Sequence, residues 1–106
     1  MIFKDCPSQM LGMVRLGRET LAVTDTSKSL AAIPAASVGD VEIVMVSIEG
    51  ADARMDLVAD PTIDIGIYME DKSTWYISGE DIVTVEFIRE ATTDLTLDAI
   101  YFGRAI

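Results

Sequence analysis

Val41–Glu49 reads VEIVMVSIE, and these nine residues decide the fold class. Apolar side chains occupy every second position of one face: Val44, Val46 and Ile48. This period of two is typical of a β-strand with one face in a core. The other face is largely apolar as well, with Val41, Ile43 and Met45. The pattern therefore predicts a strand that is covered on both sides.

The residues that follow predict a hairpin. Gly50 and Ala51 separate the first stretch from a second one, DARMDLV, at Asp52–Val58. Glycine at the first position of a two-residue turn is common in β-hairpins. If Glu49 faces Asp52, the apolar side chains of both stretches share one face. The predicted pairs are Ile48 with Ala53, Val46 with Met55, and Val44 with Leu57.

A second hairpin is predicted near the C-terminus. Val83, Val85 and Phe87 alternate with polar residues, and so do Leu95, Leu97 and Ala99. A turn around residues 90–92 would pair Phe87 with Leu95 and Val85 with Leu97. Two further strands are predicted between the hairpins, one from Ile63, Ile65, Ile67 and Met69, the other from Trp75 and Ile77. The first forty residues allow strands at Met13–Leu16, Thr20–Thr24 and Ser29–Ile33.

Together these patterns predict an all-β chain that forms a single domain over residues 1–106. An antiparallel β-sandwich with a Greek-key or jelly-roll-like strand order buries this many alternating strands most simply. The predicted core consists of Val44, Val46, Ile48, Met55, Leu57, Val83, Val85, Phe87, Leu95 and Leu97.

The N-terminal segment, residues 1–12, fits neither the strand period nor the helix period. Its apolar residues, together with the one that follows it, form our candidate interface: Ile2, Phe3, Met10, Leu11 and Met13. Pro7 and Gly12 interrupt the set, which favours an arm that is buried against a partner. The alternative is that Met10–Leu16 forms an edge strand while residues 1–9 fray.

Composition argues against several classes of function. Eighteen acidic residues against eight basic ones give a net charge of −10, which disfavours binding to nucleic acid. The chain has no histidine and one cysteine, Cys6, so the common zinc sites and a histidine-assisted nucleophile cannot be built. No apolar run is long enough for a membrane helix, and residues 1–7 do not resemble a secretory signal. We expect no enzyme activity, no cofactor and no metal, and a protein made in a cytoplasm.

Two kinds of small-ligand site remain as alternatives. The carboxylate pairs Asp52 and Asp56, Asp60 and Asp64, and Asp94 and Asp98 could in principle bind calcium, but solvated strand faces explain them more simply. Trp75, Tyr76 and Tyr68 could stack on a sugar. The chain has no asparagine and one glutamine, so few neutral side chains could orient sugar hydroxyls, and a buried Trp75 is favoured.

Four short motifs point to a family. They are VSIEGADAR at 46–54, DPTIDIG at 60–66, FIR at 87–89 and LTLDAIYFG at 95–103. The stretch from Val46 to Gly103 that contains them resembles small structural proteins of tailed-phage virions. The residues that carry the resemblance belong to turns and strand ends, such as Gly50 and Pro61, and none is a chemical site.

The resemblance implies a structural virion protein, with a capsid decoration or cement protein as the leading version. Such a protein would bind the major capsid protein or another virion protein, and would form a homo-oligomer, a trimer, through a symmetric interface. The alternatives are a carbohydrate-binding module and a minor tail or baseplate module.

Overall fold

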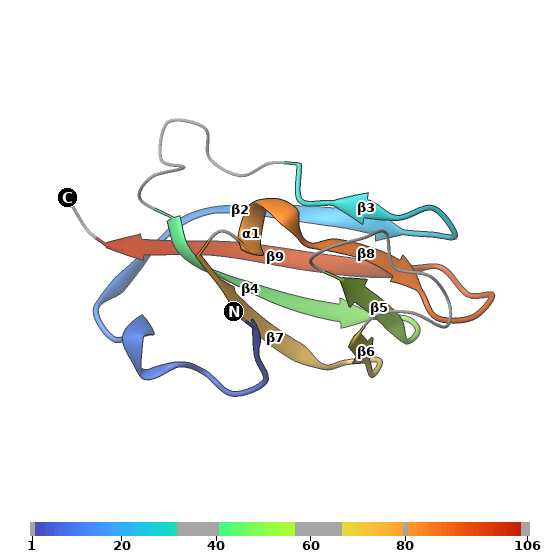
Figure 1. The fold of residues 1–106 in the computed structure, drawn as a ribbon, viewed down its shortest axis with the longest axis horizontal. Helices are drawn as coiled ribbons and strands as arrows, with labels where there is room; N and C mark the ends of the chain where they lie inside the picture. Colours follow the sequence, from blue (N-terminus) through green and yellow to red (C-terminus); the bar gives the residue numbers. More distant parts are fainter. Residues whose placement is uncertain (1, 32–40, 57–66, 80, 105–106) are drawn as a thin grey trace.

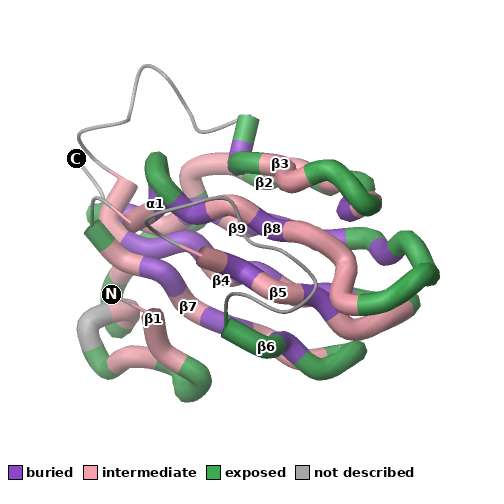
Figure 2. The backbone as a smooth tube through the Cα atoms, turned by 45° about the vertical axis from the view of Figure 1, so that its right-hand side comes forward, coloured by how far each residue is buried: buried purple, intermediate pink, exposed green. Residues whose placement is uncertain are grey.

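Two antiparallel sheets pack against each other in the structure, a computed structural model that describes residues 2–31, 41–56, 67–79 and 81–104 (Figure 1). The prediction of an all-β sandwich is confirmed. Sheet A has the order β1-β7-β4-β9-β2, and sheet B has the order β3-β8-β5-β6. Figure 2 shows buried residues alternating with less buried, mostly intermediate ones along several strands, among them β7 and β9.

The strands of sheet A are β1 (Ile2–Phe3), β2 (Met13–Val23), β4 (Val41–Glu49), β7 (Thr74–Ser78) and β9 (Leu95–Arg104). Those of sheet B are β3 (Lys28–Ser29), β5 (Ala53–Asp56), β6 (Ile67–Met69) and β8 (Glu86–Arg89). Two short helices complete the described elements, the 3-10 helix η1 (Ser8–Met10) and α1 (Asp81–Thr84).

The predicted hairpin between β4 and β5 is wrong. In sheet A, β4 lies between β7 and β9, so Val46 has Trp75 and Ala99 as its register partners. In sheet B, β5 lies between β8 and β6, so Met55 has Phe87 as its partner. The chain therefore passes from one sheet to the other after β4, and Gly50 permits this turn with a φ of +115°.

The second predicted hairpin is wrong for the same reason. The partners of β9 are β4 and β2, whereas β8 lies in the other sheet between β3 and β5. Phe87 and Leu97 are both fully buried. They lie in different sheets, on opposite sides of the core, and therefore are not partners in one ladder. A period of two identifies which side chains point inward and leaves open which strand lies alongside.

Most of the predicted core is confirmed. The buried members are Val44, Val46, Ile48, Met55, Val85, Phe87, Leu95 and Leu97. Val83 is wrong: it lies in α1 and is 57% exposed, because one helical turn presents Ile82 to the core instead. Leu57 lies outside the described residues. Trp75 and Ile77 share a buried face as predicted.

The first part of the chain forms one long strand where two were expected. β2 covers both predicted stretches except Thr24, and its register with β9 shifts between Arg15 and Gly17. This bulge leaves Gly17 opposite Tyr101. The stretch predicted at Ser29–Ile33 is described only to residue 31, and its strand β3 covers Lys28–Ser29. Of the run that begins at Ile63, the structure describes Ile67 and Met69, which lie in β6.

Candidate functional site at the N-terminal segment

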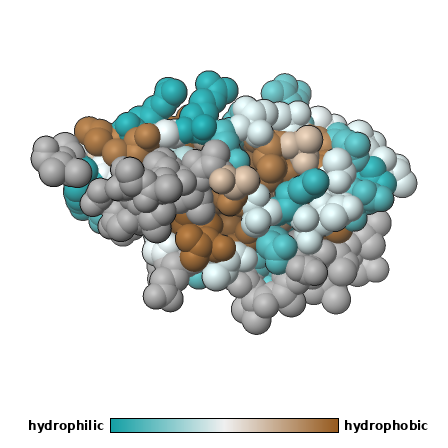
Figure 3. Space-filling model, turned by 90° about the horizontal axis from the view of Figure 1, so that it is seen from above, coloured by the Kyte–Doolittle hydropathy of each residue, from teal (hydrophilic) through white to brown (hydrophobic). Residues whose placement is uncertain are grey.

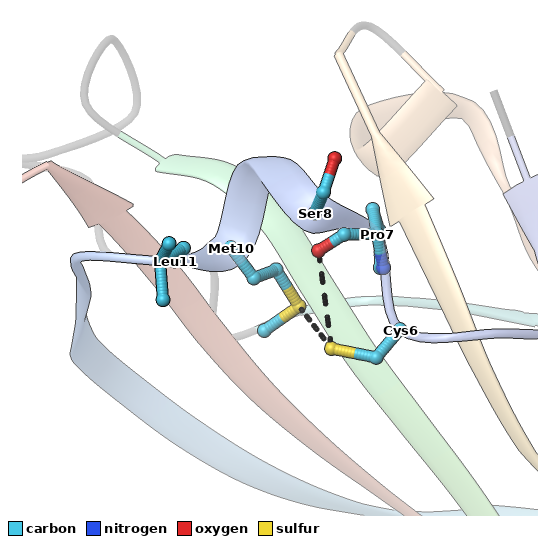
Figure 4. A pocket seen from close by; sticks show the side chains of 5 residues that line it. All are labelled: Cys6, Pro7, Ser8, Met10 and Leu11. Carbon is cyan, nitrogen blue, oxygen red and sulfur yellow. Dashed lines mark hydrogen bonds between the residues drawn. The ribbon is translucent and has the colours of Figure 1, made fainter.

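Residues 2–12 cross sheet A from one edge to the other. At one edge, β1 pairs with β7, with Ile2 opposite Ile77 and Phe3 opposite Tyr76. At the other edge, β2 begins at Met13. The close view shows η1 passing in front of β4 between these two edges (Figure 4). The N-terminal segment therefore lies over the outer face of sheet A, away from sheet B.

Burial of Ile43 supports this placement. Its neighbour Val44 belongs to the core between the sheets, so Ile43 points to the opposite, outer face of β4. Ile43 is nevertheless fully buried, and it is not a member of that core. The prediction that β4 is covered on both faces agrees with this burial. Of the described elements, the N-terminal segment is the one seen in front of β4 on this side (Figure 4).

The segment encloses an open pocket of about 500 Å³. Its lining is mostly apolar and consists of Cys6, Pro7, Ser8, Met10 and Leu11. The Cys6 sulfur lies 3.8 Å from the Met10 sulfur and 3.9 Å from the Pro7 carbonyl oxygen, so both sulfur atoms point into the same space (Figure 4). A pocket of this size and chemistry can accept an apolar side chain of another protein.

The five predicted interface residues occupy different positions around this segment. Ile2 and Phe3 are half-buried in β1, and Ile2 packs against the core. Met10 is half-buried and lines the pocket, whereas Leu11 lines the same pocket and is 87% exposed. Met13 is half-buried at the start of β2. The structure thus brings Met10 and Leu11 together and leaves Ile2 and Phe3 at the sheet's far edge.

Charge is unevenly distributed between this region and the rest of the chain. Residues 1–24 carry three basic and two acidic side chains, whereas residues 25–106 carry five basic and sixteen acidic ones. Arg15 and Arg18 lie on the outer face of β2, opposite Phe102 and Ile100. Arg18 also approaches Asp98 at 3.6 Å. The first 24 residues of the sequence therefore lack the acidic excess of the remainder.

Sequence reasoning missed several residues of this site. Cys6, Pro7 and Ser8 gave no periodic signal because a segment that crosses a sheet has no repeating face. Arg15 enters the sequence analysis only through the count of eight basic residues. The signal that could have found it is the charge balance of the first 24 residues, which is easily read from the sequence.

Hydrophobic atoms are also exposed on the side of the molecule viewed in Figure 3.

The candidate carboxylate pairs take part in local structure. Asp52 accepts a hydrogen bond from the Tyr68 hydroxyl and one of 2.7 Å from the Asp71 amide, and these bonds lower its pKa in that order of importance. The same hydroxyl bond raises the pKa of Tyr68 to about 12. Asp94 pairs with Arg89. Asp60 and Asp64 lie outside the described residues, and within the described ranges no cluster of three potential ligands could hold a metal ion.

The three aromatic residues considered for sugar binding lie on three different surfaces. Trp75 is 8% exposed on the inner face of β7, where its indole N–H donates to the Ser73 hydroxyl at 3.0 Å. Tyr76 points to the outer face, under the N-terminal segment, and its pKa is raised by burial and by the Cys6 thiol. Tyr68 lies in sheet B. They form no common stacking platform.

Comparison of the chain with protein-family profiles, with curated protein sequences and with solved structures gave no match. In the part of the chain that the structure describes, no helix has the length and apolar character needed to span a membrane.

Proposed function

We propose that this chain is a non-enzymatic structural protein of a tailed-phage virion, a decoration protein that binds the major capsid shell or another virion protein. One observation carries the proposal. A strongly acidic sandwich presents a mostly apolar pocket at its N-terminal segment, in a part of the sequence that carries no acidic excess. An apolar site that differs in charge from the rest of the chain is typical of a protein that docks in a single orientation.

The docking surface that we propose consists of the pocket, the exposed Leu11 beside it and Arg15 on the outer face of β2. The pocket receives an apolar side chain of the shell, and Leu11 contributes apolar area at its rim. Arg15, which is exposed, pairs with a carboxylate of the partner. The acidic remainder faces solvent, where its charge keeps the particles soluble.

The assignment to a virion comes from the motif resemblance. Three of the quoted motifs, at 46–54, 87–89 and 95–103, lie at structural positions of the sandwich, which is what a scaffold without chemistry needs, and the motif at 60–66 lies outside the described residues. Gly50 makes the turn between the sheets, and Arg54 pairs with Glu90 on the outer face of sheet B. Phe87 of the FIR motif lies in the core. The trimeric state belongs to the same proposal and has the same origin.

The test is sedimentation with phage heads that were assembled from the major capsid protein of the same genome and purified without this chain. We expect the chain to sediment with the heads. Leu11→Asp combined with Arg15→Glu should abolish that binding, because it places new negative charge on the docking surface. Val83→Asp is the matched control, since Val83 is also exposed but lies in α1.

The other outcomes separate the alternatives. Binding to purified tails with none to heads would replace the decoration role with a tail or baseplate role. Retention on a glycan array that is lost with Tyr76→Ala would favour the carbohydrate-binding module. If the chain bound neither heads nor tails, the virion assignment would be wrong.

A further inference from the structure

The outer face of sheet A is an apolar surface that needs a cover. Its central strands point hydrophobic and aromatic side chains outward: Ile43, Met45, Tyr76, Ile100 and Phe102. The register places Met45 between Tyr76 and Ile100, so these side chains are neighbours on one face. In the described part of the chain, the element that lies over them is the N-terminal segment. Without it, the described residues would leave this face open to water.

The attachment of that cover is slight. β1 is two residues long and pairs with β7 alone. Beyond it, Lys4, Asp5, Cys6, Ser8 and Leu11 are exposed. Two backbone hydrogen bonds of η1 are internal to the segment, from the Met10 amide to Pro7 and from the Leu11 amide to Ser8, each 3.1 Å long. The segment thus holds its own shape. Its polar contacts with the sheet include the Lys4 ammonium, 5.3 Å from the centre of the Trp75 ring, and a long hydrogen bond of 3.5 Å that the Arg104 guanidinium donates to the Leu11 carbonyl.

A hinge point lies where the segment joins β2. Leu11 is 87% exposed, so its rotation disturbs little packing. Gly12 has a φ of +83°, and no heavy atom lies within 4 Å of the position of an added Cβ. Glycine changes between positive and negative φ at low cost, so the backbone can be redirected at this residue.

We propose that residues 2–11 exchange between copies of this chain, so that the segment of one copy covers the outer face of sheet A of another. A second copy is the occupant that the structure favours, because the face already fits this segment of sequence. The exchanged contacts are the same as those within one chain, and such exchange is a low-cost route to oligomers.

Charge favours exchange through this element over docking of two whole domains. The chain carries a net charge of −10, so two bodies repel each other. Residues 2–11 contain one basic and one acidic side chain, so the element that crosses to the neighbour is close to neutral. The acidic surfaces can remain apart while the apolar face is covered. This inference is independent of the virion assignment, and its test uses the protein alone.

The first experiment uses a disulfide to report which chains pair. Phe3 and Tyr76 are register partners, and directly opposed residues in antiparallel strands can be bridged by a disulfide. Phe3→Cys and Tyr76→Cys are made in separate chains, each with Cys6→Ser. The two proteins are unfolded, mixed, refolded together and gently oxidised. Exchange predicts a covalent heterodimer on a non-reducing gel.

The matched control replaces Tyr76→Cys by Val83→Cys, which is exposed in α1 and should give only the background of random collisions. The second measurement is light scattering of chains with native Phe3 and Tyr76. Gly12→Pro should raise the oligomer fraction above that of the unchanged protein, because proline cannot adopt the positive φ of the closed form. Deletion of residues 2–11 should leave only the monomer.

Two results would overturn the exchange. One is a purely monomeric protein, at the mass of a single 11.5 kDa chain, with no cross-link above the Val83→Cys background. The other is an oligomer that persists after the deletion, or that gives no cross-link between the Phe3→Cys and Tyr76→Cys chains in the mixed sample, because its interface would then lie elsewhere.

Discussion

The hydroxyl of Tyr101 donates a hydrogen bond to the carboxylate of Glu19, and this bond joins the central strand β9 to the edge strand β2. Tyr101 is fully buried, and a buried hydroxyl requires a partner. The same carboxylate accepts a hydrogen bond from the Ala31 amide at 3.0 Å. One acidic side chain on an edge strand therefore connects sheet A with the segment that follows β3.

Truncation of the Tyr101 side chain and truncation of the Glu19 side chain should lower the free energy of unfolding by different amounts. Tyr101→Phe removes the hydroxyl and leaves Glu19 bonded to Ala31, so we expect a loss of about 1 kcal/mol in the free energy of unfolding. Glu19→Ala leaves the buried hydroxyl without its acceptor and frees the Ala31 amide, so a loss of about 2 to 3 kcal/mol is expected. Urea unfolding measures both. An equal or reversed order would show that the hydroxyl finds another acceptor.

Stability should fall at alkaline pH. Burial, and then the bond to Glu19, raise the pKa of Tyr101 above the ordinary tyrosine value. The folded state thus holds this proton more tightly than the unfolded state, in which tyrosine ionises near pH 10, at roughly its model-peptide pKa. Its contribution to stability is complete below that pH and is lost as pH rises above it. Urea midpoints measured across this range should decline, and less so in Tyr101→Phe.

The Tyr68 phenol should titrate late. Its pKa is raised to about 12, chiefly because its hydroxyl donates to Asp52. Phenolate absorbance should therefore show one group that ionises near pH 12 and disappears in Tyr68→Phe. Asp52→Asn should move that step down toward about 10, the ordinary value, because the charged acceptor is gone. An unchanged step in Asp52→Asn would mean that another group holds the proton.

Ile43 should contribute as much to the free energy of unfolding as a residue of the core between the sheets, although it lies outside that core. Ile43→Ala is expected to cost about 2 to 5 kcal/mol, the usual range for a fully buried isoleucine. Val83→Ala is the exposed control and should stay within about 0.5 kcal/mol.

The cost at Ile43 should also depend on the N-terminal segment. When residues 2–11 are deleted, Ile43 becomes exposed and the effect of Ile43→Ala should shrink. Urea unfolding of the four combinations forms a double-mutant cycle that measures this coupling. Independent effects in the cycle would show that another part of the chain covers Ile43.

The sequence predicted which face of each strand is buried far better than which strands pair in a sheet. The alternation in β4 and β5 correctly placed Val46 and Met55 in the core, and a tight turn between them suggested a hairpin. Strands that face each other across a core have the same inward pattern as strands that pair, so alternation alone could not separate the two. The prediction that Val83 is buried failed because α1 is a single helical turn, which is too short to show its period in the sequence.

The candidate site was predictable only as a set of residue types. An apolar segment without a period indicated that Met10 and Leu11 need a special environment, and the structure places them at a pocket. That the segment lies on its own sheet could not be predicted, because β1 is too short to leave a pattern. The bond between Tyr101 and Glu19, whose residues are 82 positions apart, was equally invisible.

The position of β9 has a consequence for biosynthesis. Residues Leu95–Arg104 are made after every other described strand, yet they form the strand between β4 and β2. On the ribosome, β2 and β4 must therefore wait with apolar faces uncovered until this stretch has emerged. A stalled nascent chain that ends before Leu95 should be a chaperone client and be cleaved readily by protease, whereas one extended far enough to release Arg104 should become resistant in a single step.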